Sequence, residues 1–121
     1  MFISEKKAEY ENINRKLVDV CGANEKKIVN RYYRVELLSY NDLGNILLTI
    51  GNIHITNEEE GVYVATINGG VMKKNYATVV IELQDEKIRI AVYADEGIIN
   101  QHTSEGVINE FERYINKYIR K

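Results

Sequence analysis

The sequence predicts an α+β fold, in which an antiparallel β-sheet of four to six strands, arranged as a meander, is flanked by an N-terminal and a C-terminal α-helix. Two observations indicate this class. Apolar residues recur every three or four positions near both ends of the chain, and they alternate with a period of two through its middle. A chain of 121 residues suffices for one core and is short for two, so we expect a single domain over residues 1–121.

The composition of the chain argues against some classes of function, above all binding to nucleic acid and to membranes. The 16 basic and 18 acidic residues give a formal charge of −2, which disfavours nucleic acid and anionic membranes as partners, because both draw affinity from clustered Lys and Arg. No apolar run approaches the length of a membrane span or signal peptide. A single cysteine cannot form an internal disulfide, so we expect a reducing, cytoplasmic location.

The first element is a helix over residues 4–21. Ser4 is the expected N-cap and Gly22 the expected C′ residue. Spacings of three and four residues define one apolar stripe that should face a core, made of Tyr10, Ile13, Leu17, Val20 and Cys21.

The next elements are less sharply patterned. Residues 24–40 predict a turn or helical extension and then a strand near 31–39, with turn residues at 40–42. Ile46, Leu48 and Ile50 alternate in one phase, whereas Ile53 and Ile55 alternate in the other. Either a hairpin turning at residues 51–52 or a bulge in one long strand over 46–56 would restore a common face.

The strongest pattern is a hairpin over residues 76–94, preceded by a strand at 62–67 and a turn at 68–70. If Asp85 and Glu86 form a two-residue loop, Val79 pairs with Val92 and Glu82 lies opposite Arg89. A longer loop is the alternative, because Asp-Glu is poor type I′ chemistry. A slip of one residue would turn the apolar set outward, so pattern and register support each other.

The last element is a helix from about residue 103 to Ile119, capped by Thr103 or Ser104. Its apolar stripe is formed by Val107, Ile108, Phe111, Ile115, Tyr118 and Ile119. We expect this helix to pack on the sheet. A more curved alternative is a half barrel closed at one end by this helix, as in pleckstrin-homology-like domains; it rests on analogy of fold alone.

One polar segment is a candidate ligand site. Residues 95–105 join the last strand to the last helix, where free backbone N–H groups could bind an anion. The structural alternative is a capped helix start facing water, and it is favoured because Asp95, Glu96 and Glu105 would repel an anion. The candidate ligand-binding residues are Glu96, Asn100, Gln101, His102 and Thr103.

The sequence contains no strong catalytic, metal or nucleotide motif. His54, His102 and Cys21 lack the close ligand spacing of zinc sites, and a Gly-rich turn at 68–70 with Lys73 and Lys74 nearby fails the Walker pattern. A surface histidine, a buried small cysteine and a hairpin turn beside a basic edge strand are the simpler interpretations. We therefore expect no metal and no cofactor, and we favour a non-enzymatic protein over an enzyme.

Nine tyrosines against two phenylalanines and no tryptophan indicate a second feature. In the hairpin register, one outer face carries Tyr76, Thr78, Val80 and Tyr93. That face is either covered by the first helix, the favoured alternative, or exposed as a partner surface, where tyrosine is enriched. The sequence thus predicts a non-enzymatic binding or regulatory module acting through a protein partner or self-association; a small-ligand binder or minor enzyme using residues 95–105 is the alternative.

Overall fold

The computed structural model describes residues 7–69, 75–95 and 102–120. Their secondary structure follows in chain order. The elements are α1 (Lys7–Cys21), the short 3-10 helix η2 (Glu25–Lys27), β1 (Val29–Arg34), α2 (Tyr40–Ile50), β2 (Gly51–Asn57), β3 (Val62–Gly69), β4 (Asn75–Gln84), β5 (Lys87–Tyr93), α3 (Thr103–Ile115) and the 3-10 helix η4 (Asn116–Tyr118).

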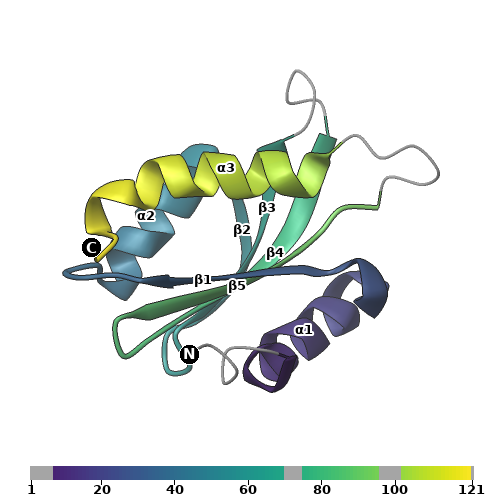
Figure 1. The fold of residues 1–121 in the computed structure, drawn as a ribbon, viewed down its shortest axis with the longest axis horizontal. Helices are drawn as coiled ribbons and strands as arrows, with labels where there is room; N and C mark the ends of the chain where they lie inside the picture. Colours follow the sequence, from purple (N-terminus) through teal and green to yellow (C-terminus); the bar gives the residue numbers. More distant parts are fainter. Residues whose placement is uncertain (1–6, 70–74, 96–101, 121) are drawn as a thin grey trace.

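The five strands form one antiparallel sheet in the order β1-β5-β4-β3-β2. Figure 1 shows α1 on one side of this sheet and α2 with α3 on the other. The predicted α+β class, with a helix from each end of the chain packed on an antiparallel sheet, is confirmed. Strands β2 to β5 follow one another as a meander, and β1 joins beside β5, so β1 and β2 are the two edges.

The β4–β5 hairpin has the predicted register. Val79 pairs with Val92, and Glu82 pairs with Arg89. Asp85 and Glu86 both adopt left-handed backbone conformations, with φ of 53° and 62°. Two consecutive positive φ values are what a two-residue type I′ loop requires, so the turn forms although neither residue is a glycine.

Alternation along the strands divides the apolar side chains between two cores. One core lies between the sheet and the α2–α3 layer, and the other lies beneath α1. The larger core includes Leu43, Leu47, Tyr63, Ala65, Val79, Ile81, Ile90, Val92, Val107 and Phe111. The smaller core consists of Tyr10, Ile13, Leu17, Ala23, Val62, Val64, Val80 and Ala91.

Helix α2 was not predicted. Residues 40–42 were expected as a turn and 46–50 as part of a strand, yet all of them belong to this helix. Ser39 is its N-cap: the hydroxyl accepts from the Asp42 N–H, and the Asp42 carboxylate accepts from the Ser39 N–H in a capping box. Leu43, Leu47 and Ile50, spaced by four and three residues, form the buried face.

Strand β2 begins directly after α2, so neither a hairpin at residues 51–52 nor a single strand over 46–56 exists. A β-bulge does interrupt β2, but it lies between Ile53 and Ile55 and not at Gly51, so the prediction of a common face for these two residues is wrong: Ile53 pairs with Ala65 of one core and Ile55 with Val64 of the other. Gly51 ends α2 and approaches the β3 backbone so closely that a Cβ would collide with the Thr66 carbonyl oxygen. The first strand, expected near 31–39, is displaced to β1 at 29–34.

Helix α1 ends at Cys21, as predicted, and Gly22 follows it with a φ of 68°. Other details of the terminal helices differ from the prediction. Val20 and Cys21 are exposed rather than part of the buried stripe of α1, and the expected cap Ser4 lies outside the described residues. His102 occupies the N-cap position of α3 without a side-chain cap, whereas the expected cap Thr103 is buried as the first helical residue. Helix α3 was expected to reach Ile119 but ends at Ile115, and the next turn is the 3-10 helix η4.

A partly buried hydrogen bond joins α3 to the edge strand β1. The Tyr33 hydroxyl in β1 donates to the Glu112 carboxylate at 2.6 Å, and the Tyr33 ring contacts Phe111. Burial, reinforced by the hydrogen bond to Glu112, raises the pKa of Tyr33. Near the C-terminus, Ile119 forms an isolated antiparallel bridge with Val35, just after β1. The chain thereby pairs with the edge of the sheet at this point.

Candidate functional site

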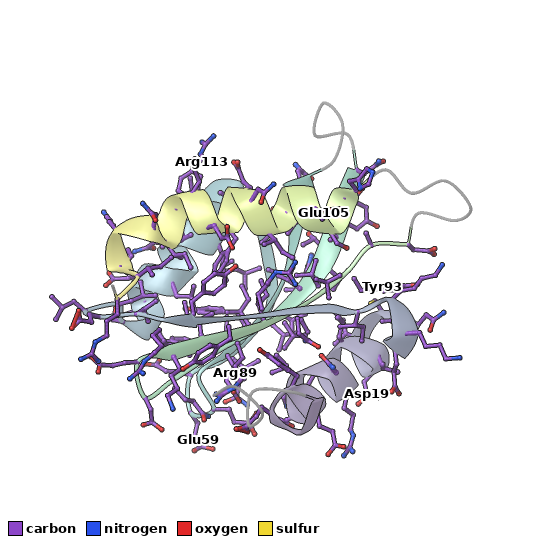
Figure 2. The ribbon with its side chains drawn as sticks, viewed as in Figure 1. Asp19, Glu59, Arg89, Tyr93, Glu105 and Arg113 are labelled. Carbon is purple, nitrogen blue, oxygen red and sulfur yellow. The ribbon has the colours of Figure 1, made fainter. Side chains whose placement is uncertain are left out.

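The face predicted to carry the tyrosines is only partly covered. Helix α1 packs against β4 and β5, and Val80 is fully buried beneath it while Tyr93 is half-buried. Figure 2 shows Tyr93 beside the C-terminal end of α1. For Val80 the covered alternative is therefore right, and this residue does not contribute to a partner surface. Tyr76 and Thr78, further along β4, lie beyond this core.

The uncovered part of this face spans β2, β3 and β4. Directly opposed residues of an antiparallel sheet project to the same side, and the register pairs Asn52 with Thr66 and Thr66 with Thr78. It likewise pairs Asn68 with Tyr76, and Ile55 with Val64 of the α1 core. We call this surface the open face; it consists of Asn52, His54, Ile55, Thr66, Asn68, Tyr76 and Thr78.

The open face combines exposed apolar groups with uncharged polar ones. Tyr76 is 62% exposed and Ile55 is 47% exposed, which makes them two of the most exposed large apolar side chains in the described residues. His54 Nε2 lies 3.0 Å from Thr66 Oγ1, so the imidazole is fixed over the strand surface. No Asp, Glu, Lys or Arg is among these seven residues, although 28% of the chain is charged. Few charges together with exposed Tyr and Ile are typical of interface centres.

Charged side chains border the covered part of the same face. Arg89 lies 3.7 Å from the Glu82 carboxylate and 5.7 Å from the centre of the Tyr32 ring. Desolvation raises the pKa of Glu82, and the nearby Arg89 charge opposes this shift. Lys16 of α1 reaches Glu60 in the β2–β3 loop at 3.1 Å. The Lys16–Glu60 pair attaches α1 to the β2–β3 loop, whereas the Glu82–Arg89 pair joins two strands of the sheet.

The segment predicted to bind a ligand is described only in part. Glu96, Asn100 and Gln101 lie outside the described residues. His102 is exposed, and its Nδ1 lies 2.9 Å from Glu105 Oε1. Thr103 is buried beside Gly69, where a Cβ would meet the Thr103 carbonyl oxygen and Val107. The close contact gives Thr103 and Gly69 a packing role.

The two histidines do not share a site. His54 contacts Thr66 on the sheet face that α1 occupies, whereas His102 precedes α3, which packs on the opposite face. Within the described residues no group of three or more His, Cys, Asp or Glu side chains is placed to hold a metal ion. Cys21, predicted as a small buried residue, is exposed, with its thiol directed at the Leu17 carbonyl oxygen.

The predicted hairpin turn at 68–70 is described only at its start. Asn68 and Gly69 belong to β3 itself, while Gly70, Lys73 and Lys74 lie outside the described residues. β4, which follows, has strand neighbours on both sides, so it is not the basic edge strand that the sequence predicted.

The predicted partner surface lacked five members of the open face: Asn52, His54, Ile55, Thr66 and Asn68. Sequence reasoning singled out Tyr76 and Thr78 because the hairpin register was evident, but it had no register for the β2–β3 pair. The short loop between Asn57 and Val62 could have supplied the register of the β2–β3 pair. It brings these two residues opposite each other once β2 is known to start at Gly51.

No protein-family model matches this chain, and no curated protein matches it significantly. Among the helices of the described residues, none is long and apolar enough to cross a membrane. The class that the fold defines is therefore a small α+β protein with a five-stranded antiparallel sheet between helices.

Proposed function

We propose that this protein is a non-enzymatic binding module that acts through protein–protein contact, including contact with its own kind. The observation that carries the proposal is the open face, where an uncharged region of the sheet presents Tyr76 and Ile55 to solvent. A sheet face of this composition resembles an interface centre more closely than a solvated surface.

The arrangement of polar groups supports binding rather than chemistry. His54 hydrogen-bonds to a threonine hydroxyl, and His102 lies next to Glu105 at a helix start on the other side of the sheet. A nucleophile or general base needs a partner group and a shared reaction space, and these two histidines have neither in common.

Purification of the tagged protein from the cells that produce it, followed by light scattering of the pure protein, tests the proposal. We expect a co-purifying protein or a self-associated species that is lost with Tyr76→Glu. Leu48→Glu is the matched control, because Leu48 is 61% exposed but lies on α2. A strictly monomeric protein with no co-purifying protein sensitive to Tyr76→Glu would reject the proposal.

A further inference from the structure

The composition of the open face restricts what can cover it. A surface that meets a second copy of itself across a two-fold axis must be complementary to itself. A cluster of side chains of one charge is not complementary to itself, because the two-fold axis brings like charges opposite each other. The open face contains no Asp, Glu, Lys or Arg among its seven residues, so two such faces can approach without this penalty.

Its polar side chains are also self-complementary. Asparagine amides and the hydroxyls of threonine and tyrosine each donate and accept hydrogen bonds. Asn52, Asn68 and Tyr76 are exposed, while Thr66 and Thr78 are half-buried between them. Each of these groups can therefore bond to its own kind on a second copy, with Ile55 and Tyr76 supplying the apolar contact.

The position of the face on the sheet allows a second copy to approach. β2 is an edge strand, and among the described residues no further strand lies beyond it. Its sequence Gly-Asn-Ile-His-Ile-Thr-Asn has no charge and no proline, whereas the opposite edge, β1, carries Arg31 and Arg34. The bulge between Ile53 and Ile55 disfavours a continuous edge-to-edge ladder, which makes packing of the two faces the better geometry.

From these features we infer that the open face is a self-association surface, on which the open face of a second copy packs about a two-fold axis. This inference rests on the proposed function and names its partner. Seven residues on each side are fewer than the roughly 20–30 of a standard interface, so the dimer should be weak and concentration-dependent.

Sedimentation of the full chain between about 10 μM and about 1 mM, a range that captures weak complexes, tests the inference. We expect reversible dimerisation, with amide NMR shifts on dilution confined to β2, β3 and β4 on the open face. Tyr76→Glu and Ile55→Glu should each raise the dimer Kd at least about tenfold, because each places two like charges in the contact. Leu48→Glu should leave the Kd unchanged.

The NMR dilution series needs no variant, so the inference remains testable if either substitution impairs folding. A wild-type chain that is monomeric up to about 1 mM overturns the inference, as does a dimer that survives both face variants or dissociates equally with Leu48→Glu. A monomer that co-purifies with a different protein through Tyr76 also overturns it, yet leaves the proposed function standing. A monomer without any such protein rejects both.

Discussion

Gly44 lies in the middle of α2, where a glycine is normally unfavourable by about 1 kcal/mol relative to alanine. Here a Cβ would collide with the Tyr63 hydroxyl, which donates to the Tyr40 carbonyl oxygen at 2.8 Å. The Tyr63 ring is itself fixed by stacking on Tyr40, with centroids 4.1 Å apart. The glycine therefore lets α2 approach β3 closely enough to form this tyrosine pair.

Gly44→Ala should destabilise the protein by about 1–3 kcal/mol, because the cost of overpacking exceeds the gain in helix propensity. Urea denaturation followed by circular dichroism measures the change. Asn45→Ala, at the next and exposed helical position, is the control and should be neutral or slightly stabilising. A stabilised Gly44→Ala variant would show that the tyrosine pair does not restrict this position.

Tyr63 also makes stability depend on alkaline pH. Burial is the main cause that raises the pKa of Tyr63 to about 12, and its neighbour Tyr40 adds to the shift. In the unfolded chain the phenol ionises near its ordinary value of about 10, so above that pH the unfolded state binds fewer protons than the folded one. The contribution of Tyr63 is complete below pH 10 and decreases as the pH rises towards 12.

Tyr63→Phe should therefore lose less of its unfolding free energy between pH 9 and about 11.5 than the wild type does, although it is less stable at pH 8. Chemical denaturation across this range provides both curves. Parallel curves for the two proteins would mean that Tyr63 ionises equally in both states.

At the scale of the element, the β4–β5 hairpin keeps its two-residue loop against the preference of its residues. Asp85 and Glu86 hold positive φ values that cost an ordinary residue roughly 1–2 kcal/mol. The Val35 N–H donates to the Glu86 carbonyl oxygen at 2.9 Å, and this backbone bond does not depend on the side chain. The register of the apolar residues outweighs the unfavourable turn chemistry.

Glu86→Gly should stabilise the protein by about 0.5–1 kcal/mol, because relief of the left-handed strain exceeds the added entropy of the unfolded chain. Lys87→Gly, one residue later within β5, is the control and should destabilise it. Thermal and urea unfolding measure both effects. Destabilisation by Glu86→Gly would argue against this loop conformation.

The cross-strand pair of Glu82 and Arg89 is mostly buried, with each side chain 13% exposed. Removing one partner leaves the other poorly solvated, so Arg89→Met should cost about 1–3 kcal/mol. The double variant Glu82→Leu/Arg89→Met should cost less than the sum of the single ones. A double-mutant cycle on urea unfolding gives the coupling, and additive costs would contradict the pairing.

The exposed pair of Arg120 and Glu36, 4.0 Å apart, serves as the control for that cycle. Its coupling should be no more than about 1 kcal/mol, because solvent screens exposed ion pairs.

The sequence predicts an element correctly where its apolar spacing fits either a helix or a strand but not both. The β4–β5 hairpin satisfies pattern, register and charge pairing together, whereas residues 46–50 fit two periods. Ile46, Leu48 and Ile50 alternate like a strand, yet Leu43, Leu47 and Ile50 share one helical face, and the Ser39–Asp42 capping box selects the helix. The Ser39–Asp42 capping box is therefore the sequence signal that predicts a helix for residues 40–50.

For the molecule as a whole, the sequence indicated that α1 must bury its stripe but not how far it would reach. Its coverage ends over Val80 and Tyr93, and it leaves Tyr76 exposed, although all three share one face. Coverage depends on where a helix docks, which is a property of tertiary packing and not of local periodicity. For this reason the sequence could not tell that Val80 is buried beneath α1 while Tyr76, at the other end of β4, stays exposed.

The molecule as a whole consists of one sheet with α1 on one face and α3 on the other, and the open face lies outside the core that α1 covers. Figure 2 shows Glu105 and Arg113 on the α3 side and Arg89 on the α1 side. The two layers draw on adjacent strand residues, since Val79 belongs to the α2–α3 core and Val80 to the α1 core.

The most direct measurement is a set of side-chain NOEs in a dilute NMR sample. The account predicts NOEs between Leu17 and the Val80 cluster, NOEs between Phe111 and the Val79 cluster, and none from the Tyr76 ring to any of the helices. NOEs that join Leu17 to Val79, or Tyr76 to a helix, would contradict it.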